Sequence, residues 1–438
     1  MEFLAIIGGG PAGYTAAEQA AKAGKHVVLF EKDTLGGTCL NVGCIPTKTL
    51  LYSAKQYFNA THAQKFGVTA ENVAFDFAAM QKRKTIVVRK LVAGIKQRLN
   101  NEFCTVVNGE ASVVSRTDEK VVIVCNGVEY EAENLLICTG STNFVPPIPG
   151  IKDNPAVWNS TDALAAKELP SSIIIVGGGV IGMEFATLYH ELGIPVTVIE
   201  ALPRILPNID SEIAGILHDQ YSKDGIQILT DTKVLEIKDN TAITSQGDFT
   251  ASHILVCVGR RANLTGLEAL TDLEYDRGIK VDDFMRTNLS NVYAAGDVTG
   301  KIMLAHAASR QAEVAVGRML KQIPVQRIAY NAIPSVVYTN PEIASVGITE
   351  NEMDCEIHRL PMTYSGRFVA ENEGQTGLCK MLIDKKSQSI MGVHMIGNPC
   401  SEFIAAASFA VRMGYTIPEF KQVVFPHPTV SEILKEVL

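Results

Sequence analysis

The chain has 438 residues, of which 47% are apolar and 20% charged, a composition typical of a globular protein and not of a disordered one. At about 150 residues per domain, this length predicts about three domains. The net charge of −8 and the lack of a basic stripe argue against nucleic-acid binding, and no apolar run is long enough to predict a membrane span.

The nine cysteines lie mostly in apolar runs typical of buried strands. Cys125, Cys138 and Cys257 each follow such a run, and we expect them to be small buried apolar residues. The apolar start Phe3–Ile7 is short, lacks a basic flank and leads into a glycine loop, so it does not resemble a secretory signal. We therefore expect a cytoplasmic location, where a disulfide is catalytic more often than structural.

The first 31 residues follow the pattern of a βαβ dinucleotide-binding unit. The pattern consists of a strand at Leu4–Ile7, the turn Gly8-x-Gly10-x-x-Gly13, a helix to about Lys22 and a strand at His26–Phe30 before Glu31. In such a unit the first glycine makes a tight turn, the second lets backbone approach a pyrophosphate, and the third lets helix pack on strand. The pyrophosphate meets free N–H groups at the helix N-terminus, and the acid accepts hydrogen bonds from a ribose diol.

Two cysteines, Cys39 and Cys44, are five residues apart in the motif GGTCLNVGCIPTK at residues 36–48. A disulfide needs Cα atoms about 4.4–6.8 Å apart, which five residues of regular helix exceed, so we expect a bend between them. Gly43 permits the bend, and Pro46 removes a backbone donor just after it. At the head of a helix, the dipole and the free N–H groups would stabilise a thiolate.

Three other interpretations of this pair are open. The cysteines could be structural thiols, or they could begin an iron–sulfur site, since C-x4-C opens the plant-type spacing. That site needs another cysteine at position 47, which is threonine. A zinc site would need a second close pair of ligands, which the sequence does not offer, so we expect no metal.

The next elements lead into a second copy of the glycine pattern. We expect a long helix at Phe75–Asn100, strands at Val121–Cys125 and Leu135–Cys138, and a linker at Pro146, Pro147 and Pro149. The second copy consists of a strand at Ile173–Val176, Gly177-x-Gly179-x-x-Gly182, a helix to about Leu192, a strand at Pro195–Ile199 and Glu200. In both copies the acid lies 18 residues after the third glycine, and the sequence therefore predicts two separate βαβ units.

The C-terminal half adds three features. A strand is expected at Ile254–Val258, and Val292–Asp297 precedes a helix at about Ala305–Leu320. Alternating residues at Gly377–Ile383 and Ser389–Ile396 predict an antiparallel sheet with helices. The fold class is therefore α/β, with two Rossmann-like dinucleotide-binding domains and a C-terminal α+β domain. The expected bounds are 1–146 with 264–324, 147–263, and 325–438.

His427 lies between two prolines, on a stiff stretch of backbone. An imidazole titrates near neutral pH and can therefore accept and return a proton. Glu432, five residues later, could bind its other nitrogen and fix the tautomer. The alternative is an ordinary histidine in a surface loop, and it is less favoured because the same chain contains the Cys39–Cys44 motif.

The cysteine motif resembles the redox-disulfide motif of the pyridine nucleotide–disulfide oxidoreductases. The order of features resembles that family along the whole chain, from the first glycine fingerprint and the dithiol to the second fingerprint, the Gly-Asp motif and the C-terminal domain. Within the family, the chain is most similar to members that oxidise dihydrolipoamide to lipoamide and reduce NAD to NADH, through a redox-active disulfide and FAD.

The resemblance also implies roles for single residues. The residues implied for FAD are Gly8, Gly10, Gly13, Glu31, Gly37, Thr38, Lys48, Ala111, Thr139, Gly140, Asp297, Leu304 and Ala305. Those implied for NAD are Gly177, Gly179, Gly182, Glu184, Glu200, Val234 and Gly259. The implied catalytic residues are Cys39, Cys44, His427 and Glu432, and Glu184 is expected to pair with Lys48 beside the nicotinamide.

The implied partners are a second copy of the chain and a lipoyl-bearing protein. In the family, the histidine and glutamate reach the dithiol of the other subunit, which implies a homodimer with shared active sites. The lipoyl domain or carrier protein would belong to a 2-oxo acid dehydrogenase complex or the glycine cleavage system. A non-catalytic flavoprotein or a docking subunit is the alternative class, against which the retained Cys39, Cys44 and His427 argue.

Two details separate this chain from other members. Glu200 favours NAD because a carboxylate would repel a 2′-phosphate, although Arg204 is close enough in sequence to keep NADP open. Phe425 stands where many members that oxidise dihydrolipoamide carry a second histidine, and the chain is shorter than is typical. The phenylalanine at position 425 and the shorter chain both bear on the shape of the substrate channel.

Overall fold

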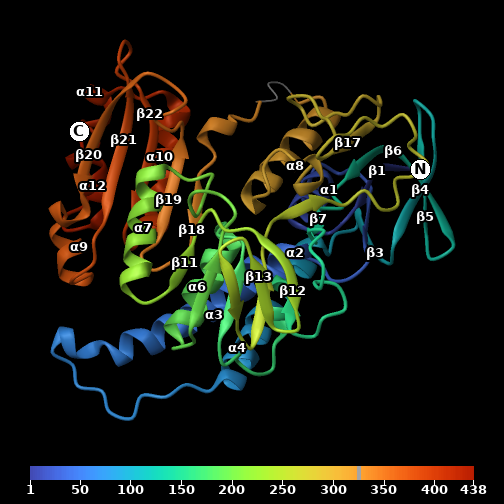
Figure 1. The fold of residues 1–438 in the computed structure, drawn as a ribbon. Coiled ribbons are helices and arrows are strands. Elements are labelled where there is room, and N and C mark those ends of the chain that lie inside the picture. Colours follow the sequence, from blue (N-terminus) through green and yellow to red (C-terminus); the bar gives the residue numbers. More distant parts are fainter. Residues whose placement is uncertain (323–326) are drawn as a thin grey trace. The chain divides into compact units, whose positions relative to one another are not determined.

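The structure is a computed structural model that describes residues 1–322 and 327–438. The chain forms two compact units, and Figure 1 labels their helices and strands. Unit one consists of Met1–Thr49, Ala78–Phe144 and Gly259–Ile328, and unit two of Leu50–Phe77, Val145–Val258 and Ala329–Leu438. The expected domain boundary at residues 324 and 325 lies outside the described residues, and the three domain bounds stay predictions.

Unit one is built on a mixed sheet, which in the described residues has seven strands in the order β3-β2-β1-β6-β5-β4, with β17 also paired to β6. The end of β6 lies between β1 and β17, both parallel to it, whereas its beginning pairs antiparallel with β5. A short ribbon, β7 with β16, is separate from this sheet. The strands are β1 (Glu2–Ile7), β2 (Val27–Glu31), β3 (Cys104–Asn108), β4 (Ala111–Arg116), β5 (Val121–Cys125), β6 (Val128–Ile137), β7 (Ser141–Asn143), β16 (Arg260–Ala262) and β17 (Val292–Ala294).

The helices of unit one begin close to the site residues. Pro11 begins α1, a position where the missing N–H and fixed φ of proline suit a helix. The buried face of α1 consists of alanine and glycine residues, and the helix packs against α8. The helices are α1 (Pro11–Lys22), α2 (Gly37–Val42), α3 (Cys44–Thr61, which continues into unit two), α4 (Phe77–Leu99) and α8 (Ala305–Met319), with the 3-10 turn η2 (Asp297–Thr299).

Unit two contains a parallel sheet in the order β11-β10-β9-β15-β8 and a small antiparallel sheet, β12-β13-β14, within the described chain. The strands of the parallel sheet are short and apolar, as is typical of strands covered on both faces. The elements are η1 (Ala63–Phe66), β8 (Val157–Trp158), α5 (Ser160–Ala165), β9 (Ile173–Val176), α6 (Val180–Glu191), β10 (Val196–Ile199), α7 (Ser211–Lys223), β11 (Gln227–Leu229), β12 (Val234–Lys238), β13 (Thr241–Thr244), β14 (Gly247–Thr250) and β15 (His253–Val256).

The C-terminal part of unit two is an antiparallel sheet in the order β18-β19-β22-β21-β20, covered by α10. Helix α7 contacts β22 and helix α6 contacts β18, so both helices lie beside this sheet (Figure 1). The elements are η3 (Tyr330–Ala332), β18 (Ser335–Val337), β19 (Ile343–Gly347), β20 (Cys355–Pro361), η4 (Met362–Tyr364), α9 (Gly366–Glu371), β21 (Leu378–Asp384), β22 (Ile390–Ile396), α10 (Cys400–Met413), α11 (Ile417–Phe420), η5 (Val430–Glu432) and α12 (Ile433–Glu436).

The predicted α/β fold class is confirmed by these sheets. The long helix α4 and helix α8 begin or end within two residues of their predicted limits. The C-terminal strands at residues 377–383 and 389–396 are β21 and β22, and they pair antiparallel as expected. Among the residues described, no helix combines the length and the apolar character needed to cross a membrane.

Candidate functional site

The first glycine loop connects β1 to α1 and leaves no room for a side chain at the first and third glycines of its pattern, Gly8 and Gly13. Gly8 has φ +107°, and a Cβ there would lie 2.2 Å from the carbonyl oxygen of Cys138. A Cβ on Gly13 would lie 1.8 Å from the carbonyl oxygen of Gly8. Gly10 forms the N-cap of α1 without a side-chain cap, so the first N–H groups of the helix have no side-chain acceptor. This loop fits a pyrophosphate.

Glu31, at the end of β2, binds the glycine loop directly. Its Oε2 accepts the N–H of Gly9 at 2.8 Å, and its Oε1 accepts the N–H of Asp33 at 2.8 Å. The Glu31 carboxylate therefore joins the glycine loop to the turn after β2, and it places a negative charge beside the loop. Glu31 is buried and lies where a ribose-binding acid is expected.

The dithiol segment bends between its cysteines, as expected. Helix α2 ends at Val42, and Cys44 is the first residue of α3. At the break, a Cβ on Gly43 would lie 2.9 Å from the carbonyl oxygen of Thr38. The bend therefore depends on glycine at this position.

The surroundings of Cys39 and Cys44 act differently on the two thiols. A hydrogen bond with Cys44, together with burial, raises the pKa of Cys39 far above its ordinary value. The ammonium group of Lys48, one helical turn after Cys44, acts in the opposite direction. Cys44 is the first residue of α3, where the helix dipole and free backbone N–H groups would stabilise a thiolate.

Asn41 is a site residue that the sequence analysis missed. Its Nδ2 donates to the carbonyl oxygens of Thr34, Leu35 and Gly37 at 3.1, 3.2 and 3.0 Å, which closes the turn before the dithiol. A Cβ on Gly37 would lie 2.7 Å from the Cα of Gly10, so this turn packs on the first glycine loop. The position of Asn41 inside the cysteine motif was the available signal.

Asp297 belongs to a second polar cluster that the sequence analysis did not find. Its Oδ2 accepts the hydroxyl of Ser141 at 2.6 Å, and Ser141 accepts the Nε–H of Arg260 at 2.7 Å. Before Asp297, the N–H of Gly296 donates to Oε1 of the fully buried Gln311 at 2.6 Å. The residues are far apart in sequence, and no local pattern indicated the cluster.

The other residues implied for FAD also lie in unit one. Ala111 is buried at the start of β4. The hydroxyl of Thr139 donates to the carbonyl oxygen of Asn263 at 2.5 Å, and Gly140, with φ +71°, accepts the N–H of the same residue. Leu304 is the N-cap of α8 and Ala305 its first residue, again without a side-chain cap, which leaves N–H groups for a ligand.

The second glycine loop, between β9 and α6, repeats the first. Gly177 has φ +107°, and a Cβ on Gly182 would lie 2.0 Å from the carbonyl oxygen of Gly177. Gly179 caps α6 without a side-chain acceptor and faces open space. Glu200 accepts the N–H of Gly178 at 2.6 Å and that of Leu202 at 2.8 Å, the same pattern as in the first loop.

Arg204 does not take the role that kept NADP open. Its guanidinium donates to the carbonyl oxygens of Leu206, Pro207 and Ile209, at 3.2, 2.6 and 2.8 Å. Since these three carbonyls bind both of its terminal nitrogens, the guanidinium holds its own loop together. The charge beside the second loop is therefore that of Glu200, which favours NAD.

The remaining residues implied for NAD are spread over both units. Glu184 is buried on α6, and its Oε1 accepts the N–H of Tyr338 at 3.1 Å. Val234 begins β12 in unit two, whereas Gly259, with φ +123°, precedes β16 in unit one. The pairing of Glu184 with Lys48 stays a prediction.

His427 and Glu432 form the expected pair in unit two. His427 Nδ1 lies 2.9 Å from Glu432 Oε1, and Glu432 Oε2 accepts the N–H of Thr429 at 2.8 Å. These two hydrogen bonds, the one from Thr429 first, lower the pKa of Glu432. The His427 side chain is 81% exposed, so its ring is open to a substrate or a second subunit.

Comparison with known proteins assigns the family. The model of the pyridine nucleotide-disulphide oxidoreductases matches residues 3–312, and that of their dimerisation domain matches residues 333–438. The chain belongs to the pyridine nucleotide-disulphide oxidoreductase family. The family predicted from the cysteine motif is thereby confirmed.

Similar members of this oxidoreductase family cover the whole chain. A dihydrolipoyl dehydrogenase from Bacillus subtilis is 38% identical over 99% of this chain and 97% of its own length, and one from Chlamydia pneumoniae is 37% identical over 98% and 95%. The solved structure of LpdA from Mycobacterium tuberculosis is 26% identical with a TM-score of 0.92, over 100% of this chain and 99% of that chain. The flavoprotein disulfide reductase RclA from Escherichia coli is 28% identical with a TM-score of 0.86, over 99% and 98%.

This pyridine nucleotide-disulphide oxidoreductase is a flavin-dependent, NAD-linked enzyme that acts on a dithiol–disulfide pair. The predicted cofactors, FAD and NAD, are confirmed at the level of the family, and the two glycine loops fit them. The dimerisation domain at residues 333–438 supports the predicted homodimer.

Proposed function

We propose that the chain is a dihydrolipoyl dehydrogenase, which oxidises protein-bound dihydrolipoamide to lipoamide and reduces NAD. The observation that carries this proposal is the hydrogen-bonded Cys39–Cys44 pair at the head of α3. The full-length similarity to dihydrolipoyl dehydrogenases supports the choice of substrate.

The sulfur chemistry follows from the position of Cys44 at the head of α3, where a leaving thiolate would be stabilised. His427 accepts a proton from one substrate thiol, and the thiolate attacks Cys39 of the oxidised pair. The substrate–Cys39 bond forms while the Cys39–Cys44 bond breaks, and Cys44 leaves as a thiolate. The second substrate thiol then attacks the first substrate sulfur and passes its proton to the departing Cys39, which releases lipoamide.

Bound FAD supplies the chemistry that the dithiol lacks, acceptance of an electron pair and hydride transfer to NAD. The residues that would hold it are those of the first glycine loop with Glu31, the turn at Gly37, and Asp297. Those that would hold NAD are the second glycine loop and Glu200.

We further propose that the exposed His427 and its partner Glu432 serve the dithiol of the other subunit. Glu432 holds the imidazole by Nδ1, which leaves Nε2 to face the substrate thiol. The protein partner would be a lipoyl domain or lipoyl carrier protein of a 2-oxo acid dehydrogenase complex or the glycine cleavage system. The proposed location is the cytoplasm, since a catalytic dithiol works in a reducing compartment.

An anaerobic titration of the purified enzyme with dihydrolipoamide, then NAD, tests the proposed function. We expect a long-wavelength absorbance band between thiolate and oxidised flavin, which fades as NADH absorbance rises. If NADH reduces the flavin but dihydrolipoamide does not, the enzyme acts on a different disulfide and the proposed substrate is wrong.

A further inference from the structure

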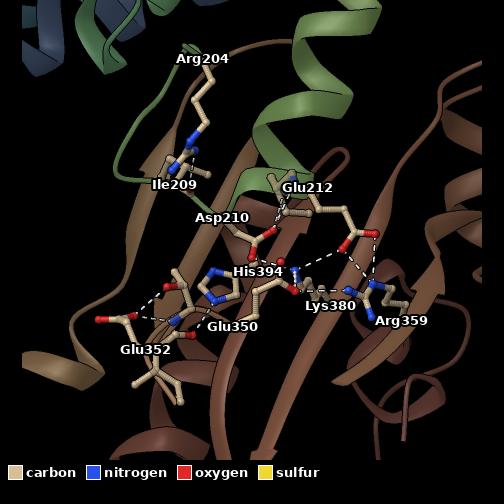
Figure 2. A network of polar contacts seen from close by, with 12 residues as sticks. Arg204, Ile209, Asp210, Glu212, Glu350, Glu352, Arg359, Lys380 and His394 are labelled. Atoms are coloured by element: carbon tan, nitrogen blue, oxygen red, sulfur yellow. Dashed lines mark hydrogen bonds and ion pairs between the residues drawn. The ribbon is translucent and has the colours of Figure 1, made fainter. Parts of the chain in front are cut away.

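A buried charge cluster connects the NAD-binding part of unit two to its C-terminal sheet (Figure 2). Lys380, on β21, is completely buried, and its Nζ lies 2.9 Å from Asp210 Oδ2 and 2.7 Å from Glu350 Oε2. Glu212 lies 3.2 Å from the same Nζ, and it also binds Arg359 Nε at 2.8 Å. Three carboxylates thus surround one ammonium group.

The cluster keeps Lys380 charged inside the protein. Burial alone would lower the pKa of Lys380, but the hydrogen bonds with Glu350 and Asp210 outweigh it and raise the pKa. A buried ion pair seldom adds net stability over an apolar replacement, because both charges lose their hydration. What it provides is a fixed geometry between the elements that carry the charges.

Asp210 connects the charge cluster to helix α7. Its Oδ1 caps α7 by accepting the N–H groups of Glu212 and Ile213, at 3.1 and 3.3 Å. Its Oδ2 accepts the ammonium of Lys380. One carboxylate therefore joins the first turn of α7 to strand β21.

The segment between Glu200 and Asp210 carries this connection to the second glycine loop. The guanidinium of Arg204 binds three carbonyls of the segment, that of Ile209 at 2.8 Å among them (Figure 2). The N–H of Leu206 donates to the carbonyl oxygen of Gly178 at 2.8 Å. Hydrogen bonds thus run from the glycine loop through the segment to Ile209, which precedes Asp210 directly in the chain.

We propose that Lys380 is a positioning residue for NAD: through Asp210 it sets the segment at residues 200–210 and, with it, Glu200 and the second glycine loop. The inference rests on the proposed assignment of that loop to NAD. It makes the binding of NAD depend on a residue of the dimerisation domain, at residues 333–438.

The sharpest test is Asp210→Asn in the full-length holoenzyme. Asparagine is as good an N-cap as aspartate, so the α7 cap stays, while the charged bond to Lys380 is lost. We expect KM for NAD to rise about tenfold with kcat within about twofold of the unchanged enzyme. The rate of flavin reduction by dihydrolipoamide without NAD should not change.

Lys380→Met and the double variant test the route. Because Lys380 acts through Asp210, the Lys380→Met and Asp210→Asn effects on KM for NAD should not add. If Lys380→Met fails to fold, Asp210→Asn alone decides. Lys385→Met is the control, since this exposed residue follows the same strand and pairs only with the surface residue Asp354 among the described residues. It should leave KM for NAD unchanged.

Two results would overturn the inference. One is a folded Asp210→Asn enzyme with an unchanged KM for NAD. The other is an equal loss in kcat and in flavin reduction, which indicates general damage to the fold. A Glu200→Ala variant, measured alongside, distinguishes a wrong role for Lys380 from a wrong assignment of the NAD site. If Glu200→Ala also leaves KM for NAD unchanged, the second glycine loop is not the NAD site.

Discussion

The Nδ1 atom of His427 lies 2.9 Å from Oε1 of Glu432. The other oxygen of Glu432 accepts the N–H of Thr429, the N-cap of the 3-10 turn η5. Glu432→Gln should lower kcat with dihydrolipoamide about 100-fold, because the neutral amide no longer stabilises the imidazolium. Turnover of NADH with an artificial electron acceptor should be unchanged. Glu419→Gln is the matched control: Glu419 forms the same capping box with Thr416 on α11, without a histidine. Equal losses in the two variants would mean that Glu432 serves only the cap.

Cys39→Ser should abolish dihydrolipoamide turnover and leave NADH oxidation by an artificial acceptor. The hydrogen bond with Cys44 and burial raise the pKa of Cys39. In the proposed chemistry the substrate attacks Cys39, because Cys44, at the head of α3, is the better leaving thiolate. Cys104→Ser, on β3, removes a thiol whose pKa burial alone raises to about 11, and should keep full activity. Retained dihydrolipoamide activity in Cys39→Ser would contradict the assignment.

The two glycine loops give a paired test of cofactor assignment. Glu200→Ala removes the acceptor of Gly178 N–H and should raise KM for NAD at least tenfold, whereas Glu31→Ala removes the acceptor of Gly9 N–H and should weaken FAD retention. NADP should not become a good substrate of Glu200→Ala, since Arg204 is held by backbone carbonyls. Steady-state kinetics with both nucleotides and the flavin content of each variant check this. An NADP preference in Glu200→Ala would show that Arg204 is available.

Glu191 predicts a pH dependence of stability. Burial raises the pKa of this α6 carboxyl from 4.5 to about 7, although Asn340 donates a hydrogen bond to it. Between these two values the unfolded chain releases the proton while the folded chain keeps it, so the free energy of unfolding falls as pH rises. Glu191→Gln removes this loss, of about 3 kcal/mol above pH 7. Urea unfolding at pH 5 and pH 8 should show a much larger gain in stability of the variant over the unchanged chain at pH 8 than at pH 5.

Gly37→Ala should leave the purified protein without its yellow colour. The residue has φ +57°, and a Cβ would lie 2.7 Å from the Cα of Gly10, so the turn must move away from the first glycine loop. Gly94→Ala is the control, because its position inside α4 has open space around it. That change should keep FAD and stabilise the chain by about 0.5–1 kcal/mol. Normal flavin content in Gly37→Ala would argue against this turn as part of the flavin site.

The parts predicted correctly from the sequence are those with local causes. The third glycine of each loop is required by a contact five residues away, Gly13 against Gly8 and Gly182 against Gly177. The bend at Gly43 follows from the spacing of the two cysteines. Such requirements leave a pattern in a short stretch of sequence, and the strands and helices around them follow the periodicity of apolar residues.

The parts that were missed depend on residues distant in sequence. Lys380 lies in a strand where a lysine would ordinarily be expected at the surface, and only the fold brings Asp210 to it. The bond between Ser141 and Asp297 likewise joins two separate segments of unit one. Buried polar groups of this kind leave no periodic pattern in the sequence, because the hydrogen-bond partner of each one lies in a distant segment of the chain.

The placement of β17 has a consequence for how the chain is made. This strand pairs with the end of β6, yet the ribosome must synthesise all of the parallel sheet of unit two before it reaches Val292. Until then, the edge of β6 that later receives β17 lacks its partner, with backbone N–H and C=O groups unpaired. The sheet of unit one, although begun at the second residue of the chain, is thus completed during synthesis only after the parallel sheet of unit two.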